Sequence, residues 1–296
     1  MLNVKDEKKS YLYGIISVII WSTVASAFKI SLKYLDFISL LLISSLTAIF
    51  IFFLIILLQK KLILLKNLNK KDYINSLFLG FLNPFIYYTV LFKSYSLLKA
   101  QEAQPLNYTW AIFLSIFSSI FLKQRLKILH LLGLLISFFG VFIIAIQGNI
   151  KEISFKNPFG VFLALLSAII WSLYWIYNIK DKKEEVIKLF LNFLFGFPFI
   201  LISFLLFSNK ELPLKGILGG IYVGLFEMGI TFVLWLKALR YAKYVSHITI
   251  LIYLSPFLSL FFIRIFVREK ILTSTIIGLI LIISGIFIQK IKFKNQ

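Results

Sequence analysis

The 296-residue chain contains no cysteine and only two histidines. The lack of cysteine excludes disulfide bonds, thiolate metal ligands and cysteine nucleophiles together. Neither His130 nor His247 has a second ligand at metal-binding spacing, and no glycine-rich phosphate loop or nucleophile with its base is recognisable. The sequence therefore predicts neither a metal site nor a cofactor site, and an enzyme is a poor fit.

Charged residues are also scarce, at 15% of the chain, whereas hydrophobic residues make up 60% and aromatic residues 18%. The mean hydropathy is +0.94. One soluble core cannot bury so much apolar surface, so the composition predicts an integral membrane protein that has the lipid bilayer as a partner. The 32 basic residues outnumber the 12 acidic ones. They lie in short clusters between apolar runs rather than on one face, which argues against nucleic acid binding.

Ten apolar runs are long enough to cross a bilayer, which requires about 20 residues. They cover residues 11–28, 37–58, 74–98, 102–122, 128–147, 158–179, 186–207, 214–239, 245–267 and 271–289. If both termini are cytoplasmic, the loops on that side carry more than twice as many Lys and Arg residues as the loops on the other side. The positive-inside rule therefore predicts a multi-pass protein of the cell (inner) membrane with both termini in the cytoplasm.

Residues 106–144 recur, at an offset of 145, as residues 251–289. The residues that are identical in this register are Leu106, Tyr108, Phe117, Ile120, Phe121, Gly133, Leu134, Gly140, Phe142 and Ile143. The charged break at 123–125 also falls on the charged break at 268–270. Because the interruptions recur as well as the apolar residues, an internal duplication is the better interpretation.

The duplication divides the chain into residues 1–147, a polar linker at 148–157, and residues 158–296. Each half contains five of the expected spans, and an odd number places the second half upside down in the bilayer. The sequence therefore predicts an all-α membrane protein with ten transmembrane helices, arranged as two inverted five-helix repeats around a central cavity.

Glu227, in the stretch GLFEMGITF, is the one acidic residue near the middle of an expected span. An ionisable group at that depth costs about 3 kcal/mol and suggests a function, and a carboxyl group that exchanges a proton would suit proton coupling. The alternative is a packing contact with a neighbouring helix or a lysine. Aligning Gly80 with Gly224 places Asn83 at the equivalent position of the first half.

Polar and aromatic side chains cluster at two further places. The stretch 101–110 is unusually polar for the start of a spanning helix, although Pro105 also suits an ordinary first helical turn. The sequence Ile-Ile-Trp-Ser occurs in corresponding helices of both halves, at 19–22 and 169–172. The predicted substrate-binding residues are Trp21, Ser22, Gln104, Asn107, Tyr108, Trp110, Trp171, Tyr174, Glu227 and Tyr253. Tyr108 and Tyr253 occupy equivalent positions in the duplication, so we expect them to approach one central space from opposite sides.

Small residues and prolines mark the expected helix contacts and bends. Gly133, Ser137 and Gly140 share one helical face, which predicts close packing against another helix in lipid. Three prolines lie within expected spans, where each frees a backbone carbonyl and can cause a kink; they are Pro84, Pro198 and Pro256.

The chain resembles the drug/metabolite transporter superfamily, and within it the EamA-type exporters, which include aromatic amino acid exporters. The resemblance runs through IIWSTVASAFK, LNYTWAIF, the charged break at 123–127, GLFEMGITFVLWLKALRYA and YLSPF. It implies ten helices in two inverted repeats, a central cavity, and export of small metabolites without an ATP-binding domain. The chain departs from the commoner pattern at Ala111, where a proline often follows the tryptophan, and this departure leaves a hinge there without support.

These features predict a secondary transporter that exports small metabolites, with amino acids favoured, by alternating access. A carrier of anionic or phosphorylated solutes is an alternative, and it would require Lys93 or Lys237 to point into the cavity. The favoured interpretation of both lysines is that their long stems carry the ammonium groups to the membrane surface. A non-transporting membrane receptor or assembly protein is the third possibility, and it would have a packed centre.

Overall fold

The computed structural model describes residues 6–122, 128–149, 157–241, 248 and 251–290, and these residues form helices and short connections without any strand. The elements of the first half are α1 (Glu7–Ser31), α2 (Phe37–Leu58), α3 (Leu62–Lys66), α4 (Lys70–Gly80), the kinked segment η1 (Phe81–Ile86), α5 (Tyr87–Leu97), α6 (Ala100–Asn107), α7 (Trp110–Leu122) and α8 (Ile128–Ala145). Those of the second half are α9 (Pro158–Lys180), α10 (Glu185–Phe207), α11 (Leu214–Val223), the π-helical η2 (Gly224–Gly229), α12 (Ile230–Tyr241), the 3₁₀ turn η3 (Ile252–Leu254), α14 (Ser255–Phe262), the π-helical η4 (Ile263–Val267) and α15 (Thr273–Lys290).

Six helical stretches within these ranges are long and apolar enough to cross a membrane. They are Glu7–Ser31, Phe37–Leu58, Lys70–Leu97, Pro158–Asn178, Glu185–Phe207 and Leu214–Leu239. Shorter apolar helices occupy Leu135–Ala145, Ser255–Val267 and Thr273–Ile288. The expected all-α membrane fold is therefore confirmed for the described residues, whereas the number of ten spanning helices stays a prediction.

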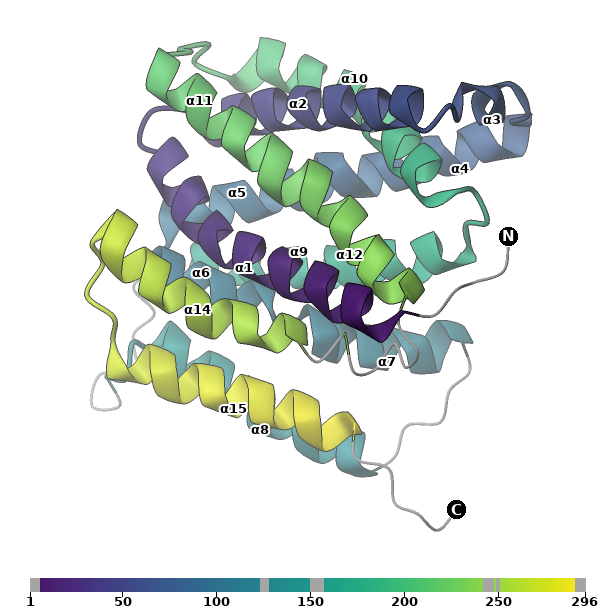
Figure 1. Cartoon of the computed structure of the whole chain (residues 1–296). Coiled ribbons are helices and arrows are strands. Elements are labelled where there is room, and N and C mark those ends of the chain that lie inside the picture. Colours follow the sequence, from purple (N-terminus) through teal and green to yellow (C-terminus); the bar gives the residue numbers. More distant parts are fainter. Residues whose placement is uncertain (1–5, 123–127, 150–156, 242–247, 249–250, 291–296) are drawn as a thin grey trace.

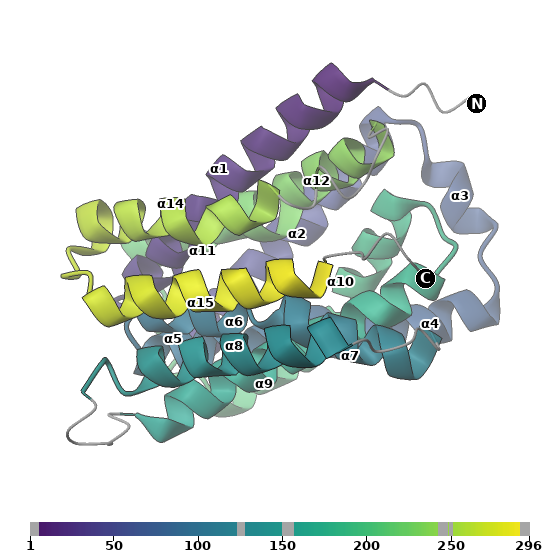
Figure 2. The same ribbon diagram turned by 90° about the horizontal axis from the view of Figure 1, so that it is seen from below.

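The helices of the two halves are interleaved (Figure 1). Helix α1 contacts α11, α12 and α14 of the second half, and α9 contacts α5, α6 and α7 of the first half. Helix α2 packs against α10, and α8 packs against α15. Figures 1 and 2 show the α8–α15 pair on the opposite side of the molecule from α2 and α10. The segments between these two pairs thus come from both halves, and they carry the candidate site.

Glycines allow the α8–α15 pair to pack at backbone distance. A Cβ atom added to Gly140 would lie 2.5 Å from the carbonyl oxygen of Gly278, and one added to Gly278 would lie 2.6 Å from the carbonyl oxygen of Gly140. An added Cβ on Gly285 would likewise meet the carbonyl oxygen of Gly133. The Ser137 hydroxyl donates to a carbonyl across the same contact, at 3.0 Å. The predicted packing role of this small-residue face is confirmed.

The three prolines differ in their effect on the backbone. The chain is kinked next to Pro84, because the backbone of Asn83 is extended (φ −148°, ψ 117°). The peptide bond between Asn83 and Pro84 is cis. Helix α10 continues past Pro198. Pro256 lies in the first turn of α14, directly after the 3₁₀ turn η3, so the chain is helical on both sides of it and changes there from 3₁₀ to α geometry.

Asp36 begins α2 and also ties it to the segment that precedes α11. Its carboxylate accepts hydrogen bonds from the N–H groups of Ile38 and Ser39, both at 2.9 Å, and from the Ser208 hydroxyl at 2.7 Å. Burial acts to raise the pKa of Asp36, but the hydrogen bonds from Ser39, Ser208 and Ile38 outweigh it and hold the pKa below its ordinary value of 3.8. The ionised carboxylate therefore stabilises the fold.

We expect the Asp36→Ala variant to be less stable than the wild type by about 1 kcal/mol, because the first turn of α2 loses its capping acceptor. Since the folded-state pKa lies below the unfolded one, this stabilisation is present at neutral pH and is lost as the pH falls through the folded-state pKa. Thermal unfolding in detergent should show the difference at about pH 7 and a smaller one at about pH 3. Asp36→Asn keeps a capping acceptor and serves as the control, and equal stability of Asp36→Ala and wild type at neutral pH would contradict the expectation.

Candidate functional site

Two irregular segments interrupt long helices at equivalent places in the two halves. η1 separates α4 from α5, and η2 separates α11 from α12. η1 is a kink at which Asn83 is extended, whereas η2 is a π-helical turn. A π turn inserts a residue into a helix and is often found at a functional site. In the register that aligns Gly80 with Gly224, Asn83 falls in η1 and Glu227 falls in η2. Asn83 is fully buried, and its side-chain amide makes no hydrogen bond of normal geometry with the described residues.

Glu227 is half-buried and bonds to the other half of the chain. The hydroxyl of Tyr88 on α5 donates to the Glu227 carboxylate at 3.1 Å. The ion pairs found among the described residues involve Asp6, Glu184 and Asp181 as the acids. No described lysine or arginine therefore pairs with Glu227, and the expected alternative of a latch to a lysine is not supported, whereas the contact with a neighbouring helix is present.

A row of aromatic rings continues from this hydrogen bond. The rings of Tyr88 and Tyr87 lie 4.7 Å apart, and Tyr87 stacks on Trp171 with centroids 4.5 Å apart and planes inclined by 25°. Phe232 on α12 contacts Trp171 at 5.9 Å and Trp21 at 6.1 Å. The two tryptophans of the repeated Ile-Ile-Trp-Ser sequence thus contact the same phenylalanine. Contacts of this geometry add about 0.5–1.5 kcal/mol each beyond burial.

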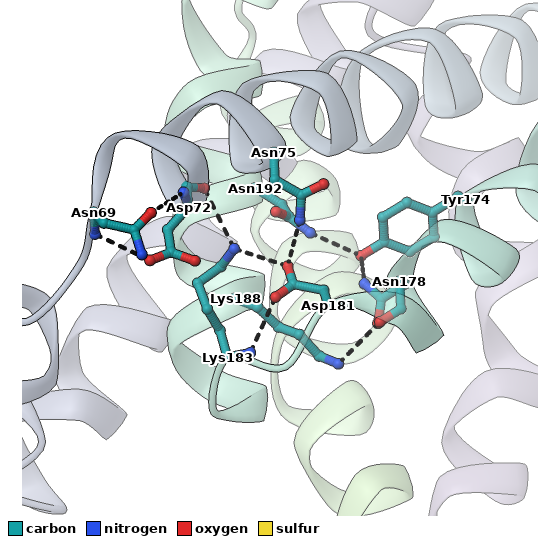
Figure 3. A network of polar contacts seen from close by, with 9 residues as sticks. All are labelled: Asn69, Asp72, Asn75, Tyr174, Asn178, Asp181, Lys183, Lys188 and Asn192. Carbon is teal, nitrogen blue, oxygen red and sulfur yellow. Dashed lines mark hydrogen bonds and ion pairs between the residues drawn. The ribbon is translucent and has the colours of Figure 1, made fainter.

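Tyr174 joins the aromatic row to a polar network near the ends of α9 and α4 (Figure 3). Its ring stacks on Trp171 at 5.5 Å. Its hydroxyl accepts hydrogen bonds from the side-chain amides of Asn178 at 2.9 Å and Asn192 at 3.3 Å. The lysine Lys188 donates to the Asn178 carbonyl at 3.4 Å. The predicted site residue Tyr174 therefore also has a structural role, because it holds α9 against α10.

Asp181, between α9 and α10, is the centre of the rest of this network (Figure 3). The Lys183 ammonium lies 2.9 Å from its carboxylate, and the side-chain amide of Asn75 on α4 donates to the same oxygen at 3.1 Å. Lys183 also donates to the carbonyl of Asp72 at 3.3 Å. The side chains of Lys183 and Asp181 are only 6% and 3% exposed, so the pair ties α4 to the α9–α10 connection away from solvent.

The Asp181→Asn variant should unfold with a free energy about 1.5 kcal/mol lower than the wild type, because a buried ammonium loses its counter-charge and keeps only neutral acceptors. Glu184→Gln is a matched acid-to-amide control. Glu184 pairs with Lys61 at 2.6 Å, but these side chains are 24% and 27% exposed, so the change should cost less than about 1 kcal/mol. Thermal unfolding of both purified variants measures the difference, and a larger loss in Glu184→Gln would refute the ranking.

In the polar stretch after α5, the later residues pack against α9, and the first residues tie helix ends together. Asn107, at the end of α6, donates from its amide to the Ser167 hydroxyl on α9 at 2.9 Å. Gln104 is buried, and its amide oxygen has no hydrogen-bond partner among the described residues. Trp110 is half-buried, and its carbonyl accepts from Ser172 at 2.7 Å. These contacts place α6 and the start of α7 against α9, beside the aromatic row.

The remaining predicted residues differ in how they relate to this row. The Ser22 hydroxyl donates to the carbonyl of Ile19 in its own helix at 2.6 Å. Tyr108 is half-buried at the end of α6 and lies close enough to Glu227 and Tyr87 for an electrostatic interaction with each. The side chain of Tyr253 lies outside the described residues, so its expected meeting with Tyr108 stays a prediction.

The first residues of the polar stretch tie helix ends together instead. The Glu269 carboxylate accepts from the N–H groups of Ala100 and Gln101, at 3.0 and 3.3 Å. The side-chain amide of Gln147 donates to Glu102 at 2.6 Å. Both carboxylates therefore serve the connections at this end of the helices.

Sequence reasoning missed Tyr87, Tyr88 and Phe232, although these rings connect Glu227 to both tryptophans. In a chain with 18% aromatic residues their composition gives no contrast. The available signal was position: Tyr87 and Tyr88 follow the expected kink at Pro84, and Phe232 follows Glu227 in the equivalent helix.

Comparisons with known proteins agree with a membrane transporter. The chain is 25% identical over 295 residues to the uncharacterized transporter YoaV of Bacillus subtilis (strain 168), covering 96% of this chain and 98% of the relative. It is also 25% identical over 294 residues to an uncharacterized transporter of Archaeoglobus fulgidus, with the same coverage. A protein of known crystal structure superimposes with a TM-score of 0.67 over 96% of both chains at 20% identity, which shows a shared fold.

The family comparison covers most of the chain. The model of the EamA-like transporter family matches residues 8–146 and 158–289. The relatives named above are transporters by name, and the apolar helices make this a multi-pass membrane protein. The chain therefore belongs to the EamA-like transporter family.

Proposed function

We propose that this protein is a secondary transporter that exports small metabolites, with amino acids as the favoured class, by alternating access. The observation that carries the proposal is Glu227, a half-buried carboxyl group in an interrupted helix that bonds to Tyr88 of the other half. An ionisable group inside a membrane protein is costly and is usually retained for transport or proton transfer. Its position where the two halves meet suits a solute site and proton coupling.

The proposed architecture is two inverted five-helix repeats, residues 1–147 and 158–296, joined by a linker at 148–157. The family match is interrupted between residues 146 and 158, close to this linker. The α8–α15 contacts support a twofold relation, because Gly140 meets Gly278 while Gly133 meets Gly285. At the 145-residue offset Gly133 corresponds to Gly278, and Gly140 corresponds to Gly285. Gly140 therefore meets the equivalent of Gly133, and Gly133 meets the equivalent of Gly140, as across a twofold axis. The two helices run antiparallel.

The connections that precede α2 and α10 support the same relation. Each of these helices begins at an acidic capping residue that accepts a hydrogen bond from the N–H two residues later: Asp36 accepts from Ile38 at 2.9 Å, and Glu184 accepts from Val186 at 3.0 Å. In an inverted repeat these two connections lie at opposite membrane surfaces. With both termini cytoplasmic in the inner membrane, the more basic Asp181 connection faces the cytoplasm.

The alternative of an anionic or phosphorylated solute finds less support. The Lys93 ammonium lies 4.9 Å from the centroid of the Phe37 ring at the start of α2, and the Lys237 ammonium lies 5.7 Å from that of the Tyr13 ring. Both positions fit cation–π contacts near helix ends rather than a site beside Glu227. If the protein transports no solute, the third alternative, a non-transporting receptor or assembly protein, is favoured instead.

Counterflow in proteoliposomes tests the proposal. Vesicles that contain the purified protein are loaded in turn with unlabelled amino acids, amines, organic acids and sugar phosphates, and the uptake of the same labelled solute is measured. We expect at least one amino acid to accumulate transiently, and protein-free vesicles are the control. Accumulation of sugar phosphates alone would favour the anionic carrier, and no accumulation of any solute would overturn the transporter proposal.

A further inference from the structure

We infer that the site around Glu227 selects solutes that carry a protonated amine, and that a carboxylate on the solute is dispensable. This inference rests on the proposed transport function and names the chemical class that the site accepts. Its basis is the combination of a carboxylate without a basic partner and a row of buried aromatic rings beside it.

The counter-charge of Glu227 does not come from the described part of the protein. The three described ion pairs all lie elsewhere, and Tyr88 is a neutral donor. Lys29, on the inner helix α1, is occupied by the carbonyl groups of Tyr95 and Leu98, at 2.8 and 2.5 Å. A carboxylate at this depth is stabilised by a positive partner, so a cationic group of the solute, or a proton in its absence, fits the site.

The aromatic rings beside Glu227 strengthen its attraction for a cation. Tyr88, Tyr87, Trp171 and Phe232 follow one another from the carboxylate at ring separations of 4.5 to 5.9 Å. These rings are almost fully buried, with 0–8% of each residue exposed, so they shield their side of the carboxylate from water. An attraction between opposite charges is stronger where water is excluded.

The same chemistry disfavours anions. A solute carboxylate or phosphate placed beside Glu227 would be repelled, and no described basic side chain at the site offsets that repulsion. The hydrogen-bond donor nearest to Glu227 among the described contacts is the Tyr88 hydroxyl, which is already directed at the carboxylate. The site therefore distinguishes an amine from an acid of the same shape.

Matched triads of solutes test the inference on the full-length protein. Each triad consists of an amino acid, the amine that lacks its carboxylate and the acid that lacks its amine, for example phenylalanine, phenethylamine and 3-phenylpropionate, with corresponding aliphatic triads. Each compound is tested as a competitor of labelled-solute counterflow and for direct binding to the wild-type protein. We expect the amines to bind and the deaminated acids to bind at least about 10-fold more weakly, since a charged hydrogen bond contributes about 1.5–3 kcal/mol and 1.4 kcal/mol is tenfold.

A variant pair locates the effect. Glu227→Gln should remove the preference for the amine over the acid, whereas Glu227→Asp, which retains the charge, should keep it. Acids that bind as well as amines to the wild type would overturn the inference while leaving transport intact, and so would an unchanged preference in a folded Glu227→Gln protein. If no amine of any triad binds, the inference is overturned whatever else is transported, whereas the proposed function fails only if no solute shows counterflow.

Discussion

Replacing Glu227 by glutamine should reduce the transport rate in proteoliposomes by about 10- to 100-fold and remove its pH dependence. The substitution keeps the size and shape of the side chain but removes its charge and its ability to exchange a proton. Loss of a charged hydrogen bond costs about 1.5–3 kcal/mol, which corresponds to this range. In the wild type, transport of an amine should fall as the pH is lowered, because a proton on the carboxylate abolishes the attraction. Counterflow and proton-gradient-driven uptake measured over a series of pH values test the prediction.

Two variants control this experiment. Glu227→Asp retains the charge, so its transport should remain pH-dependent even if the shorter side chain lowers the rate. Glu102→Gln makes the same chemical change at a carboxylate that already pairs with Gln147 at 2.6 Å, away from the aromatic row. Its transport should keep the wild-type pH profile. If Glu227→Gln transports like the wild type at every pH, Glu227 has no part in coupling, and its contact with Tyr88 serves packing alone.

The helical architecture followed from the sequence because the bilayer imposes a length on every apolar segment. A spanning helix needs about 20 apolar residues, so the runs at 37–58 and 186–207 predicted α2 and α10 almost to the residue. The kink at Pro84 was predictable for a similar reason, since the ring removes a donor and restricts the residue before it. Close packing at Gly140 was predictable from the spacing of small residues.

The partners of individual polar groups were not predictable in the same way. Tyr88 and Glu227 are 139 positions apart, and no periodicity relates them; only the packing of α5 near η2 brings them into contact. The same holds for Glu269, which lies in an expected loop but accepts a hydrogen bond from the N–H of Ala100 at the start of α6. A π turn also leaves no simple pattern, because it depends on whether the surrounding helices stabilise one extra residue. Sequence reasoning therefore located polar residues at depth without showing which of them meet.

Replacing Gly140 by alanine should destabilise the folded protein by about 3 kcal/mol, the upper part of the range for overpacking. The new methyl group would lie 2.5 Å from the carbonyl oxygen of Gly278 and 3.0 Å from the backbone nitrogen of Ile282. Backbone atoms cannot rotate away as side chains can, so α8 and α15 must separate and lose the contacts between them. Unfolding followed by circular dichroism in detergent at increasing temperature measures the loss.

Gly14→Ala is the matched control, because both substitutions exchange glycine for alanine within a helix and gain about 1 kcal/mol in helix propensity. A Cβ atom on Gly14 would meet side-chain atoms and no backbone: Leu251 Cδ1 at 3.2 Å, which can shift by a few tenths of an ångström, and Ile248 Cγ2 and Ala238 Cβ at the ordinary contact distances of 3.4 and 3.9 Å. Gly14→Ala should therefore be as stable as the wild type or slightly more stable, while Gly140→Ala is clearly weakened. Equal stability of the two variants would show that α8 and α15 do not pack at backbone distance, and it would remove the reciprocal glycine contacts that support the twofold relation between the halves.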